Sequence, residues 1–153
     1  MHKPSDEERS RLLEEIGPLP LRGAAWPRWI KVLACAVLIL IAYQIVKTAM
    51  SPAGLDISPV VTGSIMLCYL ALLVLARYML VSETIISRKG ISQTWLSRRE
   101  VSWDDLHFAK FIPLIGGKRL VCFTARGRPV VFQAGTRELE IAFARISLVY
   151  RRK

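Results

Sequence analysis

Two long apolar segments dominate the hydrophobic pattern of the first half of the chain. They run from Trp29 to Thr48 and from Pro59 to Val81. Each is long enough to form a helix that crosses a bilayer hydrocarbon core about 30 Å thick. The connection between them, residues 49–58, is short and contains Pro and Gly. The pattern therefore predicts a transmembrane hairpin over residues 29–81.

After the second apolar segment the period of the pattern changes from that of a helix to that of a strand. Short runs of β-branched and aromatic residues alternate with Gly-containing turns, such as those at residues 88–90 and 126–128. From Thr136 onward, apolar residues recur at steps of three and four, which is typical of a helix. We therefore expect residues 82–153 to form a small antiparallel β domain of about five strands, closed by a helix over about residues 136–152.

The first 28 residues precede the predicted hairpin and carry one modest apolar face. Ser5 and Glu8 have the spacing of a capping box, and Gly17-Pro18 ends the segment, so a helix is expected over about residues 6–16. The polar face of this helix is acidic, which disfavours a membrane-binding role. We expect residues 1–28 to form a partly ordered cytoplasmic leader, and the sequence leaves open whether its helix touches the membrane.

Charge is distributed unevenly about the predicted hairpin. The chain has a net charge of +10, and 15 Lys/Arg against six Asp/Glu lie between Arg77 and Lys153. The connecting loop has one Lys beside it, Lys47. The positive-inside bias therefore places both termini in the cytoplasm and the loop outside the cell membrane.

Four residues near the ends of the predicted spans have the character of interface anchors. Aromatic rings and cations favour the headgroup region, where a long basic side chain extends toward water. Arg77 is the one charge within the second apolar segment, and it lies one turn from the end of that segment, which favours an interfacial position over a central one. The predicted anchors are Trp26, Trp29, Arg77 and Tyr78.

No group of residues has the spacing of a known catalytic or metal site. Two of the three cysteines lie in the apolar segments and one in a predicted strand, so a disulfide framework is not expected. Asp104 and Asp105 have no neighbouring base and suit a turn or helix cap. Gly116-Gly117-Lys118 lacks the rest of a phosphate-binding loop. We therefore expect no enzymatic activity, no cofactor and no metal site.

Four short motifs follow the hairpin in this order: Gly90-Ile91, Val101-Ser102-Trp103-Asp104-Asp105-Leu106, Arg126-Gly127-Arg128-Pro129 and Arg137-Glu138-Leu139-Glu140. Residues 80–150, which contain them, resemble the bacterial pleckstrin-homology-like domains, and most closely the YcxB-like type found in small two-span inner-membrane proteins. The resemblance implies an α+β membrane protein of the bacterial inner membrane. A complete domain of this family is expected to be a seven-stranded sandwich with a capping helix, so five strands would leave an open sheet edge.

The resemblance also implies a binding or scaffolding module. If five strands leave the bilayer in up-and-down order, the turn after the second strand and the turn after the fourth strand both return to the membrane, and a C-terminal helix that folds back adds its last residues there. The candidate contacts with anionic lipid headgroups are then Arg98, Arg99, Arg126, Arg128, Arg151, Arg152 and Lys153. The alternative is that these cations are solvated turn residues.

Two functions therefore remain open. The first is a membrane-anchored, non-catalytic binding or scaffold module that contacts anionic lipid headgroups or a protein partner. The second is an accessory or structural subunit of a larger inner-membrane complex, or of a homo-oligomer, whose close helix approach small residues such as Gly63, Ser64 and Ala71 would allow. Nucleic acid is not an expected partner, because the aromatic residues among the cations are those that the strands need for a core.

Overall fold

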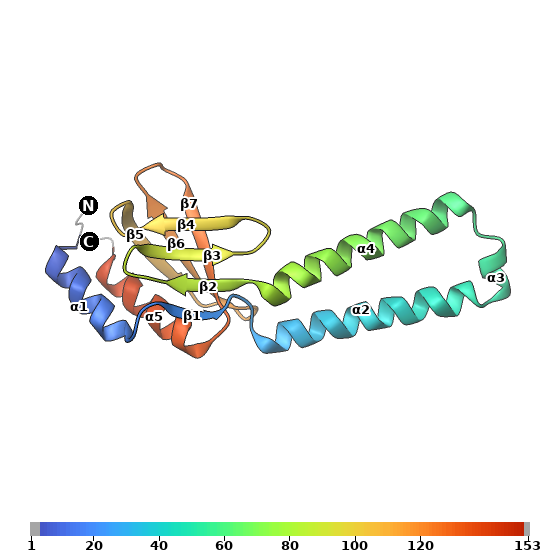
Figure 1. The fold of residues 1–153 in the computed structure, drawn as a ribbon, viewed down its shortest axis with the longest axis horizontal. Coiled ribbons are helices and arrows are strands. Elements are labelled where there is room, and N and C mark those ends of the chain that lie inside the picture. Colours follow the sequence, from blue (N-terminus) through green and yellow to red (C-terminus); the bar gives the residue numbers. More distant parts are fainter. Residues whose placement is uncertain (1–3, 152–153) are drawn as a thin grey trace. The chain divides into compact units, whose positions relative to one another are not determined.

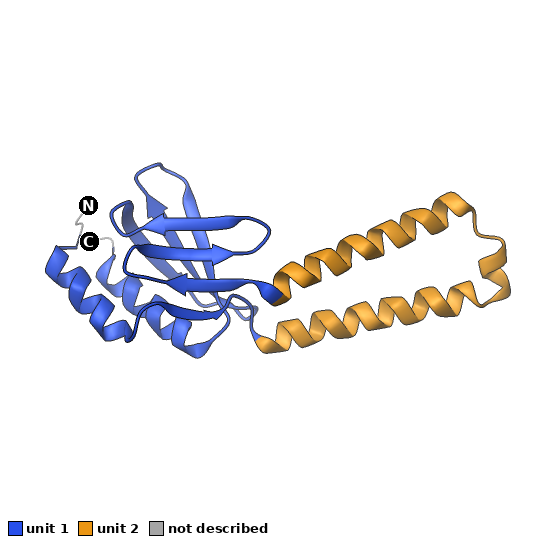
Figure 2. Cartoon of the chain, in the orientation of Figure 1, with its two compact units in different colours: residues 1–27, 81–153 blue, residues 28–80 orange. Residues whose placement is uncertain are grey.

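The structure, a computed structural model, describes residues 4–151 of the 153-residue chain. The chain forms two compact units, which are coloured separately in Figure 2. Unit 1 combines the chain up to Pro27 with the chain from Val81 onward, and unit 2 consists of residues 28–80. Unit 1 is therefore discontinuous in sequence, with the hairpin inserted into it.

Unit 2 consists of two long apolar helices joined by a short one (Figure 1). α2 spans Arg28–Ala49, α3 spans Pro52–Leu55 and α4 spans Pro59–Val81. Both long helices have the length and composition needed to cross a membrane. The helices expected at 29–48 and 59–81 are confirmed to within one residue, whereas the helical turn α3 in the connection was not predicted.

Hydrogen bonds join α2 to α4 at two levels. Near the base of the hairpin, Lys31 Nζ donates to the backbone carbonyl of Leu80 at 3.0 Å. Further along, the Tyr69 hydroxyl donates to the backbone carbonyl of Leu38 at 3.2 Å. Neither helix contains a buried residue, so the apolar side chains of the hairpin remain available to lipid or to another helix.

α1 spans Asp6–Ile16 and begins with the capping box that the sequence predicts. The Ser5 hydroxyl accepts a hydrogen bond from the Glu8 N–H at 3.2 Å, and the Glu8 carboxylate accepts one from the Ser5 N–H at 3.0 Å. Leu12 is 1% exposed and belongs to the core of unit 1, and α1 packs along the C-terminal helix. The expectation of a separate, partly ordered leader is therefore wrong for residues 4–27.

The strand β1, Leu21–Ala24, also lies before the hairpin and was not predicted. It pairs antiparallel with β2, Glu83–Ile86, and the register places Ala24 opposite Glu83. The Ala25 N–H extends this pairing by donating to the Ser82 carbonyl at 3.1 Å. One sheet thus contains strands from both sides of the hairpin, so a β domain limited to residues 82–153 is too short.

Unit 1 contains seven strands in its described residues, where about five were expected. They form two antiparallel sheets with the strand orders β1-β2-β3-β4 and β5-β6-β7. β4 is the second strand that the sequence did not predict. The strands after β2 are β3 (Gly90–Thr94), β4 (Arg98–Ser102), β5 (Leu106–Ile112), β6 (Lys118–Thr124) and β7 (Pro129–Ala134). The helix α5 follows at Arg137–Val149, within the range predicted for it.

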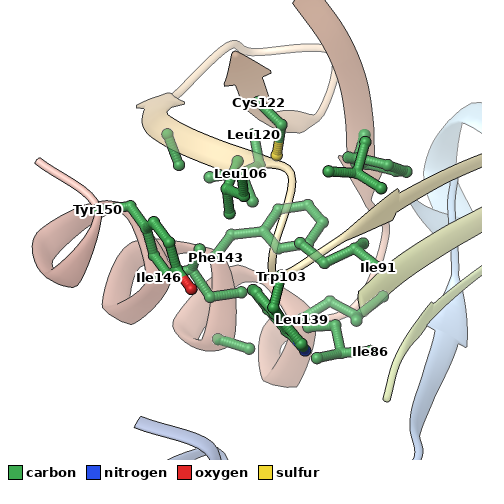
Figure 3. Close-up of a cluster of buried hydrophobic side chains, with 14 of the residues drawn as sticks. Ile86, Ile91, Trp103, Leu106, Leu120, Cys122, Leu139, Phe143, Ile146 and Tyr150 are labelled. Atoms are coloured by element: carbon green, nitrogen blue, oxygen red, sulfur yellow. The ribbon is translucent and has the colours of Figure 1, made fainter. Parts of the chain in front are cut away.

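The two sheets, α1 and α5 enclose one hydrophobic core, part of which is shown in Figure 3. α5 contributes Leu139, Phe143 and Ile146, each with no exposed surface. Trp103 stacks on Tyr150 with ring centroids 6.0 Å apart, and its indole N–H donates to the Ser87 carbonyl at 2.8 Å. Each large apolar side chain buried in this way contributes on the order of 2 kcal/mol.

The strand directions give unit 1 two ends. We call the end that contains Pro27 and Val81 the junction end, because there the chain passes into unit 2 and returns from it. The register places the turn at 95–97 and the loop at 113–117 at this end, and it places the turns at 87–89, 103–105 and 125–128 at the opposite, far end. The junction end is the same for both sheets, because β7 of the second sheet and β1 of the first sheet end next to each other there. The Gly135 N–H, just after β7, donates to the Ala24 carbonyl at 2.8 Å.

Candidate functional site

The structure separates the arginines that the sequence analysis placed together. Arg98 and Arg99 begin β4 at the junction end, whereas Arg126 and Arg128 flank the β6–β7 turn at the far end. The prediction that these four arginines lie together at the end of the domain next to the membrane is therefore wrong. Because residues 98–102 form a strand instead of a turn, every later strand runs in the direction opposite to the one expected.

Arg151, the next predicted contact, follows α5 and is exposed. Its neighbour Tyr150 stacks on Trp103, and the Tyr150 carbonyl accepts a hydrogen bond from the Ala109 N–H at 3.0 Å. These contacts hold the end of α5 beside the far-end turn at 103–105. The last two predicted contacts, Arg152 and Lys153, lie outside the described residues.

Three polar side chains tie the first sheet to the free edge of β7. The Gln133 carbonyl accepts a hydrogen bond from Thr84 Oγ1 at 2.7 Å, and the Gln133 N–H donates to the side-chain oxygen of Gln93 at 3.0 Å. Arg99 Nη1 donates to the Val131 carbonyl at 3.3 Å. Thr84, Gln93 and Arg99 are neighbours across β2, β3 and β4, so they form one polar ladder.

The polar ladder satisfies backbone groups that an uncovered strand edge would leave unpaired. It also assigns Arg99 a contact within unit 1. The sequence analysis missed Thr84 and Gln93, which are 0% and 4% exposed. A signal was present, since each lies two residues from a buried Ile on the same strand face, where an apolar residue is the usual choice.

Arg98, Lys118 and Arg119 are the other cations at the junction end of the sheets. Arg98 Nη2 lies 3.4 Å from Glu100 Oε2, and Lys118 Nζ lies 2.5 Å from Glu140 Oε2. Both ion pairs are partly exposed, so salt screens them and each contributes little to folding. The carboxylates offset part of the positive charge of this end.

The predicted interface anchors fall into two groups. Trp29, Arg77 and Tyr78 lie in the end turns of α2 and α4, and Trp29 and Tyr78 are 53% and 46% exposed. Trp26 belongs to unit 1, where its ring packs edge-on against Trp95 with the centroids 6.1 Å apart. Trp26 therefore packs within unit 1, and its role as an anchor stays a prediction, as do those of the other three.

An open groove of about 450 Å³ lies at the far end, beside α1. Its lining includes Arg88 and Lys89, and also Arg9, whose Nη1 lies 2.8 Å from Asp104 Oδ1. The hydrogen bond to Asp104 raises the pKa of Arg9 above its usual value. The groove thus mixes paired and exposed cations with carboxylates, and it does not form a uniformly basic pocket.

Unit 2 contains a space of about 470 Å³ between α2, α3 and α4. Its lining is mostly apolar, and Gln44, Thr48 and Thr62 are its polar members. In a bilayer, another helix that packed into such a space would find hydrogen-bonding partners in these polar side chains.

Within residues 4–151, no three His, Cys, Asp or Glu side chains are grouped so as to hold a metal ion. Cys35, Cys68 and Cys122 are free thiols. Cys122 has no exposed surface, and burial raises the pKa of its thiol to about 12. Its thiol is therefore protonated and unreactive near neutral pH.

Comparison with models of protein families, with curated proteins and with solved structures found no match to this chain. The function must therefore be inferred from the residues and geometry of the chain itself.

Proposed function

We propose that this chain is a bacterial inner-membrane protein whose hairpin anchors unit 1 at the cytoplasmic surface. In this proposal unit 1 is a non-catalytic binding module that contacts anionic lipid headgroups through its junction end. The observation that carries the proposal is the pairing of β1 with β2 across the hairpin.

The pairing supports insertion as a hairpin with both ends on one side of the membrane. β1 ends at Ala24 and β2 begins at Glu83, and these residues are partners in the sheet register. The chain segments on either side of unit 2 are therefore neighbours in one sheet, and no membrane can separate them. Helices also satisfy their own backbone hydrogen bonds, as the hydrocarbon core requires.

The charge distribution supports a cytoplasmic position for unit 1. The connection at 49–58 contains Asp56 as its one charged residue, and Lys47 precedes it. Nearly all other cations lie in unit 1 or in the turns of α2 and α4 next to it. The positive-inside bias favours this arrangement over its inverse.

The strand count supports a pleckstrin-homology-like architecture for unit 1. The family resemblance implies a seven-stranded sandwich with a capping helix, and unit 1 has seven strands in two antiparallel sheets followed by a C-terminal helix. The hairpin would then be an insertion between the first and second strands of such a domain. Domains of this architecture suit ligand or partner binding, and catalysis is not part of the proposal.

Arg98 and Arg119 are the best candidates for headgroup contact. Arg99 is engaged in the polar ladder, and Lys118 is paired with Glu140 at 2.5 Å, whereas the pair of Arg98 with Glu100 is longer, at 3.4 Å, and more exposed. A cation near an anionic leaflet contributes on the order of 1 kcal/mol. Arg126 and Arg128, at the far end, would then be solvated turn residues facing away from the bilayer.

The test is lipid analysis of the full chain extracted with its surrounding lipids into polymer-bounded nanodiscs. We expect anionic lipids to be enriched around the protein relative to the bulk membrane, and we expect Arg98→Gln with Arg119→Gln to reduce this enrichment. Arg126→Gln with Arg128→Gln removes the same charge at the far end and should leave the enrichment unchanged.

Two results would overturn the proposal. Equal enrichment in all three proteins, or equal loss in both variants, would refute a headgroup contact at the junction end. Release of the full chain from membranes by alkaline carbonate would refute the anchor itself.

A second candidate function is that of an accessory subunit, and the space between α2 and α4 favours it. A helix from another subunit would fill this space and find hydrogen-bonding partners in Gln44 and Thr62. The test is native electrophoresis of the chain in mild detergent, with Gln44→Leu as the variant and Tyr43→Leu, at an exposed position outside the lining, as its control. A complex that only Gln44→Leu weakens would support this function, and a monomer in every case would refute it.

A further inference from the structure

The turns at the two ends of unit 1 have opposite chemical character. The far-end turns present charged residues: Arg88 and Lys89, Asp104 and Asp105, and Arg126 and Arg128. At the junction end, the turn at 95–97 presents Trp95 and Leu96, and the loop at 113–117 presents Leu114 and Ile115. Surface turns are usually polar, so the apolar pair of turns requires an explanation.

Of the four apolar side chains named in these two turns, three are exposed, and Trp95 is half-buried. Ile115 is 98% exposed, Leu96 is 53% exposed and Leu114 is 46% exposed. The exposed large hydrophobic residues described in unit 1 are Val81, Leu96, Leu114, Ile115, Phe123, Ile141 and Leu148, and the first four lie at the junction end. Such a cluster at the tips of two turns marks a surface that contacts an apolar environment.

Both turns lie beside the segment that leads into unit 2. The ring of Trp95 packs on Trp26. In the other turn, a Cβ atom placed on Gly117 would lie 3.8 Å from Cδ of Pro27. We define the rim as the six apolar residues of these three segments: Trp26, Pro27, Trp95, Leu96, Leu114 and Ile115.

We propose that the rim embeds in the interfacial layer of the bilayer that holds the hairpin. This inference rests on the proposed membrane anchoring and adds a second, β-turn contact with lipid. Pro27 is covalently joined to the first residue of α2, and Val81 is the last residue of α4. The rim therefore belongs to the one end of unit 1 from which two membrane-length helices leave.

The composition of the rim suits the interface between headgroups and acyl chains. Indole rings favour this layer, and leucine and isoleucine side chains lower their free energy by leaving water. Arg98 and Arg119 flank the two turns in sequence and supply cations at the level of the phosphates. A protein partner in place of lipid is a distinct outcome of the test below.

The test attaches a small fluorophore to single cysteines of the full chain in lipid nanodiscs and measures its quenching by nitroxides on the lipid acyl chains. Cys35 and Cys68 are changed to Ala, while buried Cys122 stays in place because it does not react. Ile115→Cys and Leu96→Cys report on the two rim turns. Arg126→Cys is the control at the far end, and native Cys68, kept in a separate protein, reports on the span.

We expect lipid-attached nitroxides to quench the labels at 115, 96 and 68 several-fold more strongly than the label at 126, and aqueous iodide to show the reverse order. If label 68 is quenched but labels 115 and 96 behave like label 126, the rim does not enter the bilayer and only this inference fails. Protection of labels 115 and 96 from both quenchers would indicate a protein partner and would also refute it. If label 68 is not quenched, the anchoring itself fails.

Discussion

The side-chain oxygen of Gln93 accepts a hydrogen bond from the backbone N–H of Gln133 at 3.0 Å and so joins the two sheets of unit 1. Gln93→Leu would leave this part-buried N–H without a partner. The expected loss of unfolding free energy is about 1–3 kcal/mol, the usual cost of a buried unsatisfied group. Denaturant unfolding in mild detergent measures the loss, and hydrogen exchange should show faster exchange of the Gln133 amide.

Ser92→Ala is the matched control for Gln93→Leu, because Ser92 is the preceding residue and lies on the opposite face of β3. It should change the unfolding free energy by less than about 0.5 kcal/mol. If Gln93→Leu and Ser92→Ala unfold at the same denaturant concentration, the polar ladder does not join the sheets in solution.

The pairing of Ala24 with Glu83 predicts that unit 1 folds without the hairpin. A protein in which residues 1–27 are joined to 81–153 by a short Gly/Ser linker should fold, since the linker only has to replace a hairpin connection between adjacent strands. Circular dichroism should show a cooperative thermal transition. Leu12→Ala in this protein should lower its unfolding free energy by about 2–5 kcal/mol, because it leaves a cavity in the core.

The contrasting protein is residues 81–153 alone. It lacks β1 and α1, so the edge of β2 and part of the core surface lose their cover. We expect no cooperative transition for this fragment. A fragment that melts like the joined protein would show that the segment before the hairpin contributes nothing to the fold.

Local patterns predicted the helices α1, α2, α4 and α5 well, and only the short α3 was missed among the described residues. The capping box at Ser5 and Glu8, the apolar lengths of the spans and the spacing of Leu139 and Phe143 are all properties of neighbouring residues. The helices therefore begin and end close to their predicted limits. Membrane insertion of the spans stays a prediction, because the helices meet the requirements of length and composition and no membrane contact is shown.

The two missed strands show the limit of local patterns. β1 has the sequence Leu-Arg-Gly-Ala, and its strand character depends on a partner about sixty residues later in the chain. β4 begins with Arg98-Arg99-Glu100, three exposed charged residues that are typical of a loop. As an edge strand, β4 buries only Val101, so its sequence carries little alternation.

The candidate lipid site depended on those strands. Without β4, the direction of every later strand is reversed. Arg126 and Arg128 were therefore expected at the junction end but lie at the far end, and the apolar loop at 113–117 was expected at the far end but lies at the junction end. The sequence pattern placed Arg126 and Arg128 correctly in a turn, whereas Arg98 and Arg99 lie in β4. It did not determine which turns share an end, because this property depends on the number of strands.

Burial of Cys122 and Tyr150 predicts that unit 1 loses stability at alkaline pH. Burial raises both pKa values to about 12, from ordinary values of 9.0 for Cys122 and 10.0 for Tyr150. The folded state therefore retains protons that the unfolded state releases, so the contribution is complete below about pH 9 and declines as the pH rises toward 12.

The measurement is the denaturant midpoint of the full chain in mild detergent between pH 8 and pH 11. Cys122→Ala removes the thiol, so its stability should fall less steeply over this range, by about 2–3 kcal/mol at pH 11. Only the slopes are compared, because the variant also leaves a small cavity at every pH. Parallel slopes for the two proteins would contradict the burial of this thiol.

Gly135→Ala tests the close contact between the end of β7 and the segment that leads into the hairpin. A Cβ atom at Gly135 would lie 2.4 Å from the Trp26 carbonyl oxygen and 2.5 Å from that of Ala24. Both obstacles are backbone atoms, so the segment must move and the hydrogen bond from Gly135 to Ala24 must lengthen. We expect a loss of about 1–3 kcal/mol or more in unfolding free energy.

Gly116→Ala is the matched control for this contact, because a Cβ atom at Gly116 meets nothing within 4 Å. It should be neutral or slightly stabilising, since alanine has less freedom to lose on folding. Quenching of Trp26 and Trp95 fluorescence by acrylamide should increase in Gly135→Ala and stay constant in Gly116→Ala, because only the first change displaces the Trp26 backbone. If the two variants unfold alike, β7 does not approach this segment closely.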